Sequence, residues 1–363
     1  MHEFAGPTGR PPCVLPRRQG LLAAAALLLV IGAAVTTAPA AMAAAPSSQA
    51  DVAWSHFVDR DFSSAAIVTA HPDGRGLRQL TAPGTGVVDL DPVWSPDHAV
   101  IAFERDVDGV GQVVTVRADG TGERAVDIGC SAIPACDSVN DPSWTPDGNR
   151  LVFTVVIASY GEVTDVPPSA ALWTARVDGS DLRRLSEPGI DGRYEDGRAR
   201  YSADGSYLVF ERGDGATDTV AVFRMNSDGS GVRQLTPWSL NADTADLSQA
   251  TSGPTRDLVV FESYGHGGPP PGAVEDVMTV PTTCPTVDVC ATQIRNLTRN
   301  GDGPVGSDNP TWSPDGSRIA FVEYVHPAPA HGLRYADIYT MSPVGTSRQQ
   351  VSTTPTWDFR PDW

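Results

Sequence analysis

The chain contains no lysine, so all 26 of its basic residues are arginine. This absence excludes lysine Schiff-base chemistry and the phosphate-binding lysine of P-loop enzymes. The sequence also lacks the G-x-S-x-G motif of α/β-hydrolases, the H-E-x-x-H motif of zinc peptidases and glycine-rich phosphate loops. These reaction classes therefore have no support in the sequence.

Long apolar runs are equally scarce. One such run, Leu21 to Val35, follows Arg17 and Arg18 and precedes Ala-x-Ala sites, as in a secretory signal peptide. Its 15 residues are too few for a comfortable membrane span. We therefore expect residues 1–43 to be a signal peptide and residues 44–363 to be the mature chain. The mature chain is expected to have no membrane span and to be secreted, or to lie at the cell-envelope exterior of a bacterium.

Cysteine is rare, with 5 residues, of which one lies before the apolar run. The other four form two pairs of equal spacing, Cys130 with Cys136 and Cys284 with Cys290. In an exported chain this pattern predicts two disulfides. A zinc site is not favoured, because the spacing is too long for a zinc knuckle and no histidine clusters with the cysteines.

Positive charge is in short supply as well. The 44 acidic residues outnumber the arginines and give a formal net charge of −18. A basic patch for nucleic acid is therefore not expected.

A repeated phrase is present instead. "WSPDGSRIAF" begins at Trp312, and close copies begin at Trp94, Trp144 and Tyr201. Degenerate copies surround Phe261 and the chain ends, giving six copies in all. Each copy is followed by a loop, a third strand, a "DG" turn and a fourth strand, as in "DGSGVRQLT". Four-stranded units of this length, repeated six times, predict an all-β, six-bladed β-propeller of four-stranded antiparallel blades.

The two ends of the chain complement each other. The mature N-terminus begins within a repeat, at its second strand, whereas "TWDFRPDW" at the C-terminus is a first strand without a second. The fold is therefore expected to close by pairing of the C-terminal strand with the N-terminal blade, which removes free sheet edges.

These motifs resemble the repeat of TolB-like β-propeller proteins. The resemblance covers nearly the whole mature chain. It implies a propeller without the α/β domain that precedes the propeller in TolB. A related propeller occurs in prolyl oligopeptidase-type enzymes, but the hydrolase domain of those enzymes is also missing here.

Strand order predicts two unlike faces. The "SPDG" and "DG" turns share one face, called the turn face, and the longer loops share the opposite one, the loop face. The predicted loops hold 27 acidic residues and 7 Arg, whereas the rest of the mature chain holds 16 of each. A single-sign field attracts cations. The turn carboxylates are expected to be structural, namely Asp97, Asp147, Asp204 and Asp315.

Candidate binding residues follow from this asymmetry. Six carboxylates are expected at the loop-face end of the central channel, and three histidines follow second strands on the same face. They are Asp91, Glu104, Asp141, Glu211, Glu262 and Asp308, with His56, His266 and His326. Such oxygens suit Ca²⁺ or the guanidinium and amine groups of a peptide.

The predicted function is a scaffold that binds a cationic peptide, a protein or a metal ion such as Ca²⁺ through the acidic face, as a monomer. Two alternatives remain open. One is a glycan- or peptide-active lyase or hydrolase that uses the histidines and carboxylates. The other is a propeller that presents its turn face to a partner protein. A solvated acidic surface without a ligand is the simplest interpretation of the charge.

Overall fold

The computed structural model describes residues 50–59, 62–128, 130, 133, 136–157, 169–188, 193–263, 275–300, 303–325, 336–354 and 356–363. The predicted signal peptide, residues 1–43, lies outside the described residues, as do His266 and His326.

The regular secondary structure of the described residues is almost entirely antiparallel β-sheet. Four sheets have four strands each. They are β8 (Cys136–Trp144), β9 (Arg150–Ile157), β10 (Ser169–Arg176) and β11 (Arg183–Arg184); β12 (Tyr194–Tyr201), β13 (Tyr207–Asp214), β14 (Thr219–Asn226) and β15 (Arg233–Gln234); β16 (Ala242–Leu247), β17 (Leu258–Ser263), β18 (Asp276–Pro281) and β19 (Arg295–Asn296); and β20 (Val305–Trp312), β21 (Ile319–Val325), β22 (Ala336–Met341) and β23 (Gln349–Gln350).

A larger sheet of eight strands joins two similar groups. The groups are β24 (Asp358–Asp362), β1 (Val52–Phe57), β2 (Ala65–Ala70) and β3 (Arg78–Gln79), and β4 (Val87–Trp94), β5 (Val100–Val107), β6 (Val110–Arg117) and β7 (Arg124–Ala125). A single parallel residue pair, Ala65 with Val88, connects them. Each four-stranded group, whether a separate sheet or half of the large one, is called a unit below.

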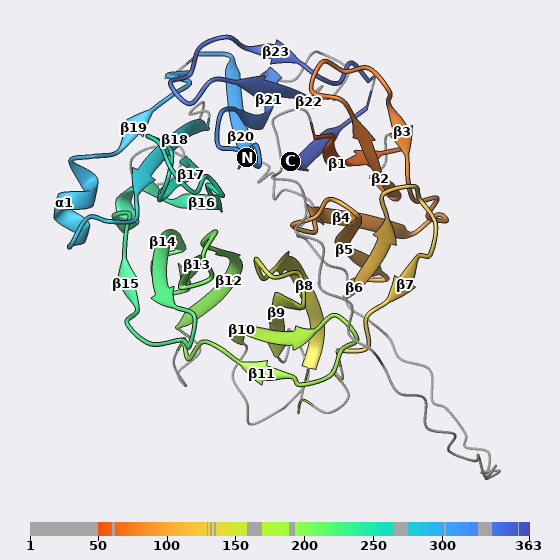
Figure 1. The fold of residues 1–363 in the computed structure, drawn as a ribbon, viewed down its shortest axis with the longest axis horizontal. Helices are drawn as coiled ribbons and strands as arrows, with labels where there is room; N and C mark the ends of the chain where they lie inside the picture. Colours follow the sequence, from red (N-terminus) through yellow and green to blue (C-terminus); the bar gives the residue numbers. More distant parts are fainter. Residues whose placement is uncertain are drawn as a thin grey trace, which may run out of the picture.

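The units stand around a common axis (Figure 1). Strands β4, β8, β12, β16 and β20 lie nearest the centre, and the two-residue strands β7, β11, β15, β19 and β23 lie at the rim. The helical elements whose bounds lie in the described ranges are a 3-10 turn, Trp238–Leu240, and α1 (Val287–Ala291). No helix in the described ranges is long and apolar enough to cross a membrane.

Apolar residues fill the spaces between units. Trp144 of β8, for example, shares a buried cluster with Val93 and Ala102 of the preceding unit, and its indole N–H donates to the Val93 carbonyl at 3.0 Å. A buried aromatic residue of each second strand contributes to the same layers, as Phe153 does here and Trp54 does in β1. The repeated aromatic residues thus hold neighbouring units together.

The repeated turns are structural, as predicted. In the turn after Trp312, the Asp315 carboxylate accepts hydrogen bonds from the Ser313 hydroxyl at 2.8 Å and the Ser317 N–H at 3.0 Å. Gly316 closes this turn with a φ of 68°, a conformation that glycine adopts at little cost.

The glycine of the "DG" turn has a second role that the sequence does not reveal. Gly229 has a φ of 86°, and a Cβ atom there would lie 2.3 Å from the Leu185 carbonyl oxygen of the preceding unit. Gly120 and, in the "VG" turn, Gly345 approach Leu80 and Leu297 in the same way, with 3.3 and 2.2 Å between the corresponding atoms. Close packing between units therefore requires glycine at this turn.

The ends of the chain pair as predicted. Strand β24 is antiparallel to β1, with Asp362 opposite Ala53 and Asp358 opposite His56. The predicted disulfides are also confirmed, since Cys130–Cys136 and Cys284–Cys290 have Cα–Cα distances of 5.6 and 5.3 Å. The second bridge holds α1 between β18 and β19, where four of the other units have a "DG" turn and the unit of β20–β23 has "VG".

Candidate functional site

A β-bulge recurs in the innermost strand of every unit. At each bulge the register with the neighbouring strand shifts, and one residue has a left-handed backbone. These residues are Asp91 (φ 48°), Asp141 (51°), Arg198 (50°), Thr244 (46°), Asn309 (48°) and Arg360 (53°). Bulges re-aim side chains, and all of these except Asp141 line a small axial cavity of 40 Å³. We call the six the bulge residues.

The bulge explains two outcomes for the predicted site. Asp91 and Asp141, which were expected at the channel, are bulge residues. In β20, however, the bulge residue is Asn309, and Asp308 precedes it, opposite Val322 of β21. The bulge residue always stands three positions before the repeated aromatic or leucine, and this spacing was the signal that could have identified it.

The three glutamates that were expected at the loop-face end of the channel lie in strands. Glu104, Glu211 and Glu262 lie inside β5, β13 and β17 and are buried, because these strands continue beyond the buried phenylalanine.

Each glutamate reaches the bulge of the next unit. Glu262 accepts the Asn309 N–H at 2.6 Å and Glu211 accepts the Ala245 N–H at 2.7 Å. Glu104 makes a longer bond of 3.4 Å to the Asp141 N–H. These carboxylates therefore join neighbouring units as well as lining the channel.

Two arginines that the sequence analysis left without a role lie among the carboxylates. Arg198 is 3.4 Å from Asp91, 3.6 Å from Asp141 and 3.5 Å from Glu211. Arg360 pairs with Asp91 and lies 3.9 Å from Asp141. Part of the predicted negative charge is thus neutralised inside the protein.

Carboxyl groups still outnumber guanidinium groups in what we call the channel cluster. The cluster comprises Asp91, Glu104, Asp141, Glu211, Asp243 and Glu262 with Arg198 and Arg360. Burial, together with the nearby Asp141 and Asp91 carboxylates, raises the pKa of Glu104 to about 8. Burial and Asp243 likewise raise the pKa values of Glu211 and Glu262.

Asp91 behaves in the opposite way. Burial disfavours its charge, but Arg360 and Arg198 outweigh that effect and lower its pKa. The cluster therefore combines an ionised, arginine-paired side with glutamates that tend to retain protons.

Three carboxylates of this cluster could hold a metal ion. Oxygens of Asp91, Glu104 and Asp141 all lie within 4.8 Å of one another. Carboxylate oxygens are the ligands that hard cations such as Ca²⁺ prefer. The Arg360 guanidinium on Asp91 would compete with such an ion.

The one candidate histidine among the described residues lies elsewhere. The Nδ1 atom of His56 is 2.6 Å from Asp358 Oδ1. No hydrogen bond or ion pair between described residues joins His56 to the channel cluster.

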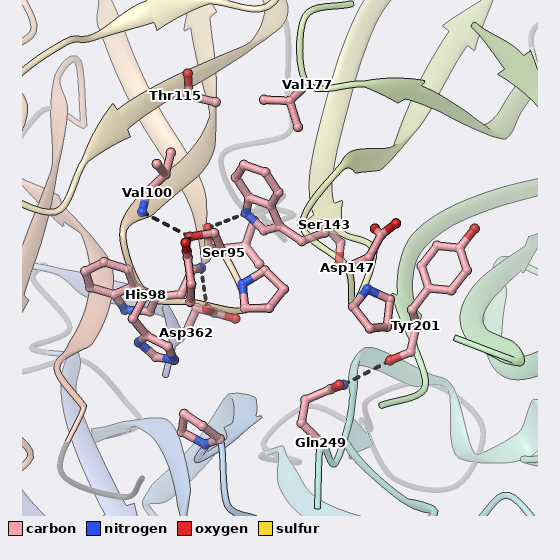
Figure 2. A pocket seen from close by; sticks show the side chains of 18 of the residues that line it. Ser95, His98, Val100, Thr115, Ser143, Asp147, Val177, Tyr201, Gln249 and Asp362 are labelled. Carbon is pink, nitrogen blue, oxygen red and sulfur yellow. Dashed lines mark hydrogen bonds between the residues drawn. The ribbon is translucent and has the colours of Figure 1, made fainter. Parts of the chain in front are cut away.

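A much larger cavity, of 1090 Å³, lies at the turn face. Figure 2 shows Ser95, His98 and Asp362 on one side of it and Tyr201 and Gln249 on the other. Burial raises the pKa of Asp362 to about 7, and the Asp246 carboxylate adds to this rise.

Some polar atoms of residues that line the turn-face cavity are unsatisfied. Within the described part of the chain, the indole nitrogens of Trp94 and Trp312 are buried without a hydrogen-bond partner. Arg200 Nε also lacks a hydrogen bond but lies 3.5 Å from Asp246 Oδ1, with which it forms an ion pair. The two indole N–H groups are donors, so they could donate to an acceptor such as water.

Comparisons with known proteins support the fold and nothing finer. No protein-family model and no curated protein matches the chain. TolB from Acinetobacter baumannii is 15% identical with a TM-score of 0.61, over 86% of this chain and 66% of that chain. The putative TolB from Agrobacterium tumefaciens is 17% identical with a TM-score of 0.55, over 83% and 88%. Kuenenia stuttgartiensis hydrazine synthase is 13% identical with a TM-score of 0.62, over 87% and 46%.

The chain thus spans slightly less than two thirds of the Acinetobacter protein and less than half of the hydrazine synthase chain. At these identities the likeness concerns architecture. Together with the repeated antiparallel sheets and the turn motifs, it establishes that this chain has a TolB-like β-propeller fold.

Proposed function

We propose that the protein is an exported binding module, a six-bladed propeller that captures a cationic group of a partner at the channel cluster. In this proposal residues 1–43 direct export and residues 44–363 form the propeller. The two disulfides support an oxidising compartment outside the cytoplasm.

The six-bladed, closed architecture is supported by packing. The eight-stranded sheet divides into two blades at its single parallel pair. Buried clusters connect consecutive units all the way round, including Trp54 of β1 with Val322 of β21. The pairing of β24 with β1 then completes the ring.

The observation that carries the functional proposal is the excess of buried carboxyl groups. Six carboxyls face two guanidinium groups in the channel cluster, and Glu104 retains a proton up to a pH of about 8. A bound cation would take the place of that proton and of the missing counter-charge.

The cluster favours a guanidinium or amine over a metal ion. Arg198 and Arg360 already demonstrate that guanidinium groups fit between these carboxylates, and both would repel a divalent ion at Asp91. We therefore infer a basic side chain of a peptide or protein as the ligand, with Ca²⁺ as the alternative.

Calorimetry can test this function. An Arg-rich peptide and, separately, millimolar Ca²⁺ are titrated into the mature protein at low salt, where screening is weakest. Binding should be lost in Glu104→Gln/Glu211→Gln. It should persist in Asp119→Asn/Asp178→Asn, which replaces two carboxyl groups at exposed turn-face positions. If neither titrant binds the wild type, the channel cluster is only a structural feature and the proposal fails.

One observation favours a second candidate function, the docking of a partner at the turn face. The 1090 Å³ cavity there is lined by residues from every unit, and the indole N–H groups of Trp94 and Trp312 lack an acceptor. A partner that binds equally to wild type and Glu104→Gln/Glu211→Gln would support this candidate. The enzyme alternative gains no similar support, since His56 does not join the channel cluster.

A further inference from the structure

Two units contain an equivalent pair of a buried aspartate and an arginine. Asp89 of β4 accepts two hydrogen bonds from Arg105 of β5, at 2.7 and 2.8 Å. Asp196 of β12 accepts two from Arg212 of β13, at 2.6 and 2.9 Å. Both aspartates are fully buried. Because a guanidinium group is always charged, each pair keeps its cation at every physiological pH.

The unit that joins the two chain ends has a different residue at the same place. Asp358 stands two residues before the bulge residue Arg360, as Asp89 and Asp196 stand before theirs, and it too is fully buried. Its partner is His56, which lies directly opposite it in the register of β24 with β1, at 2.6 Å. A titratable imidazole thus replaces the permanent cation at the contact between the two ends of the chain.

The other groups around this pair reinforce the effect of pH. Asp337 of β22 is a second carboxyl near Asp358, and burial together with the Asp358 charge raises the pKa of Asp337 to about 6. Gln350 donates to Asp337 at 2.9 Å and the Thr354 hydroxyl donates to Asp358 at 2.8 Å. On the β2 side His56 faces the uncharged Ala66.

We propose that the His56–Asp358 pair makes the pairing of β24 with β1 sensitive to pH, so that it is tightest in mildly acidic solution. A protonated imidazole supplies Asp358 with a counter-ion, as arginine does in the equivalent pairs. A neutral imidazole retains only the hydrogen bond, while the ionised Asp337 and Asp358 repel each other. The stabilisation is therefore present at low pH and is lost as pH rises.

Hydrogen exchange of the full mature chain tests this device. Protection of the β24 amides, corrected for the intrinsic rate at each pH, is compared at about pH 5.5 and about pH 8. Wild type should lose protection severalfold at the higher pH. Asp337→Asn should still show most of this loss, because His56 remains. The double variant Asp337→Asn/His56→Arg should show none, since it restores the arginine that the other units use.

A control variant introduces a histidine–aspartate pair into another unit. Arg105→His should create pH dependence in β4 and β5 and leave that of β24 as in wild type. The proposal is overturned if wild-type β24 protection is independent of pH, if Asp337→Asn alone abolishes the dependence, or if the double variant retains it. Should the arginine variant fail to fold, His56→Gln replaces it. In His56→Gln, low protection of the β24 amides at both pH values supports the proposal, and full protection at either pH value refutes it.

Discussion

The Asp362 carboxylate accepts a 2.8 Å hydrogen bond from the Trp94 N–H, so the last strand of the chain is bonded to the unit that follows the N-terminal one. Asp246 forms the same bond with Trp312, also at 2.8 Å. Both aspartates stand two residues after a bulge residue. The repeat therefore uses the same contact at the chain ends and within the chain.

Replacing this carboxyl should change the pH dependence of stability. The pKa of Asp362 is raised from 3.8 to about 7, so its ionisation destabilises the fold progressively as pH rises from about 4 to about 7. Asp362→Asn keeps the acceptor for Trp94 but cannot ionise. We expect the variant to match wild type in urea unfolding near pH 4. At pH 8 it should be more stable, by at most about 4 kcal/mol. An equal stability difference at both pH values would contradict the assignment.

Removing the central arginine should have the opposite pH signature. Arg198→Met leaves Asp91, Asp141 and Glu211 without a shared counter-ion, which costs about 3–5 kcal/mol for buried charges. The loss should be largest at pH 8 and smaller at pH 5, where the carboxyls take up protons. Denaturant unfolding at pH 8 and at pH 5 measures the two losses of stability, with Arg176→Met, at an exposed position, as the control. Comparable losses in the two variants would show that Arg198 is not a counter-ion.

Millimolar Ca²⁺ should raise the melting temperature of Arg198→Met more than that of wild type, because the freed carboxylates can then ligate the ion. A matched Glu104→Gln/Arg198→Met variant should lose this response. If Ca²⁺ does not stabilise Arg198→Met, the carboxylates lack metal-binding geometry.

A pair of glycine variants should separate close packing from backbone strain. Gly229 and Gly253 have φ values of 86° and 87°, but only Gly229 has an atom close to the position of a new Cβ. Alanine costs about 1 kcal/mol at either site from the left-handed backbone. At Gly229 the clash with the Leu185 carbonyl should add about 1–3 kcal/mol. Similar stabilities of the two variants would argue against a packing role for the "DG" glycine.

Deletion of residues 356–363 should destabilise the protein far more than the loss of eight residues suggests. The segment carries β24, Arg360, Asp362 and the Trp363 indole, which donates to the Ala50 carbonyl at 2.8 Å. We expect the melting temperature to fall by more than about 10 °C, since 1 kcal/mol shifts it by roughly 2–4 °C in large domains. A permuted chain, in which the same segment is placed before Ala50, should recover the wild-type melting temperature. Unchanged melting of the truncated protein would refute the prediction.

Most of the architecture could be predicted because the sequence repeats the same strand and turn motifs several times. The "SPDG" and "DG" turns specify hairpins through local backbone chemistry, and each apolar run between them can only be a strand. The pairing of β24 with β1 followed from the incomplete repeats at the two ends. Even a degenerate unit, with α1 and a disulfide in place of a turn, kept its strand order.

The channel was harder to predict, since its chemistry depends on register and on contacts between units. A one-residue bulge places Asn309 where Asp308 was expected. Glu104 and Glu211 lie inside strands, because β5 and β13 continue beyond the apolar residues that reveal them in the sequence. Charge counting could not reveal that Arg198 and Arg360, about 160 residues apart in the chain, lie against the same Asp91 carboxylate.

The bulge residues have a consequence for how this scaffold can change. Each lies outside the turns and the aromatic positions that specify the repeat, yet five of the six line the axial cavity. Substituting acids, arginines and amides at these six positions would therefore change which ions can bind at the centre of the propeller. The turn and aromatic residues that specify the surrounding sheets would remain the same. Variation in ligand and conservation of architecture are thus encoded by separate sets of residues.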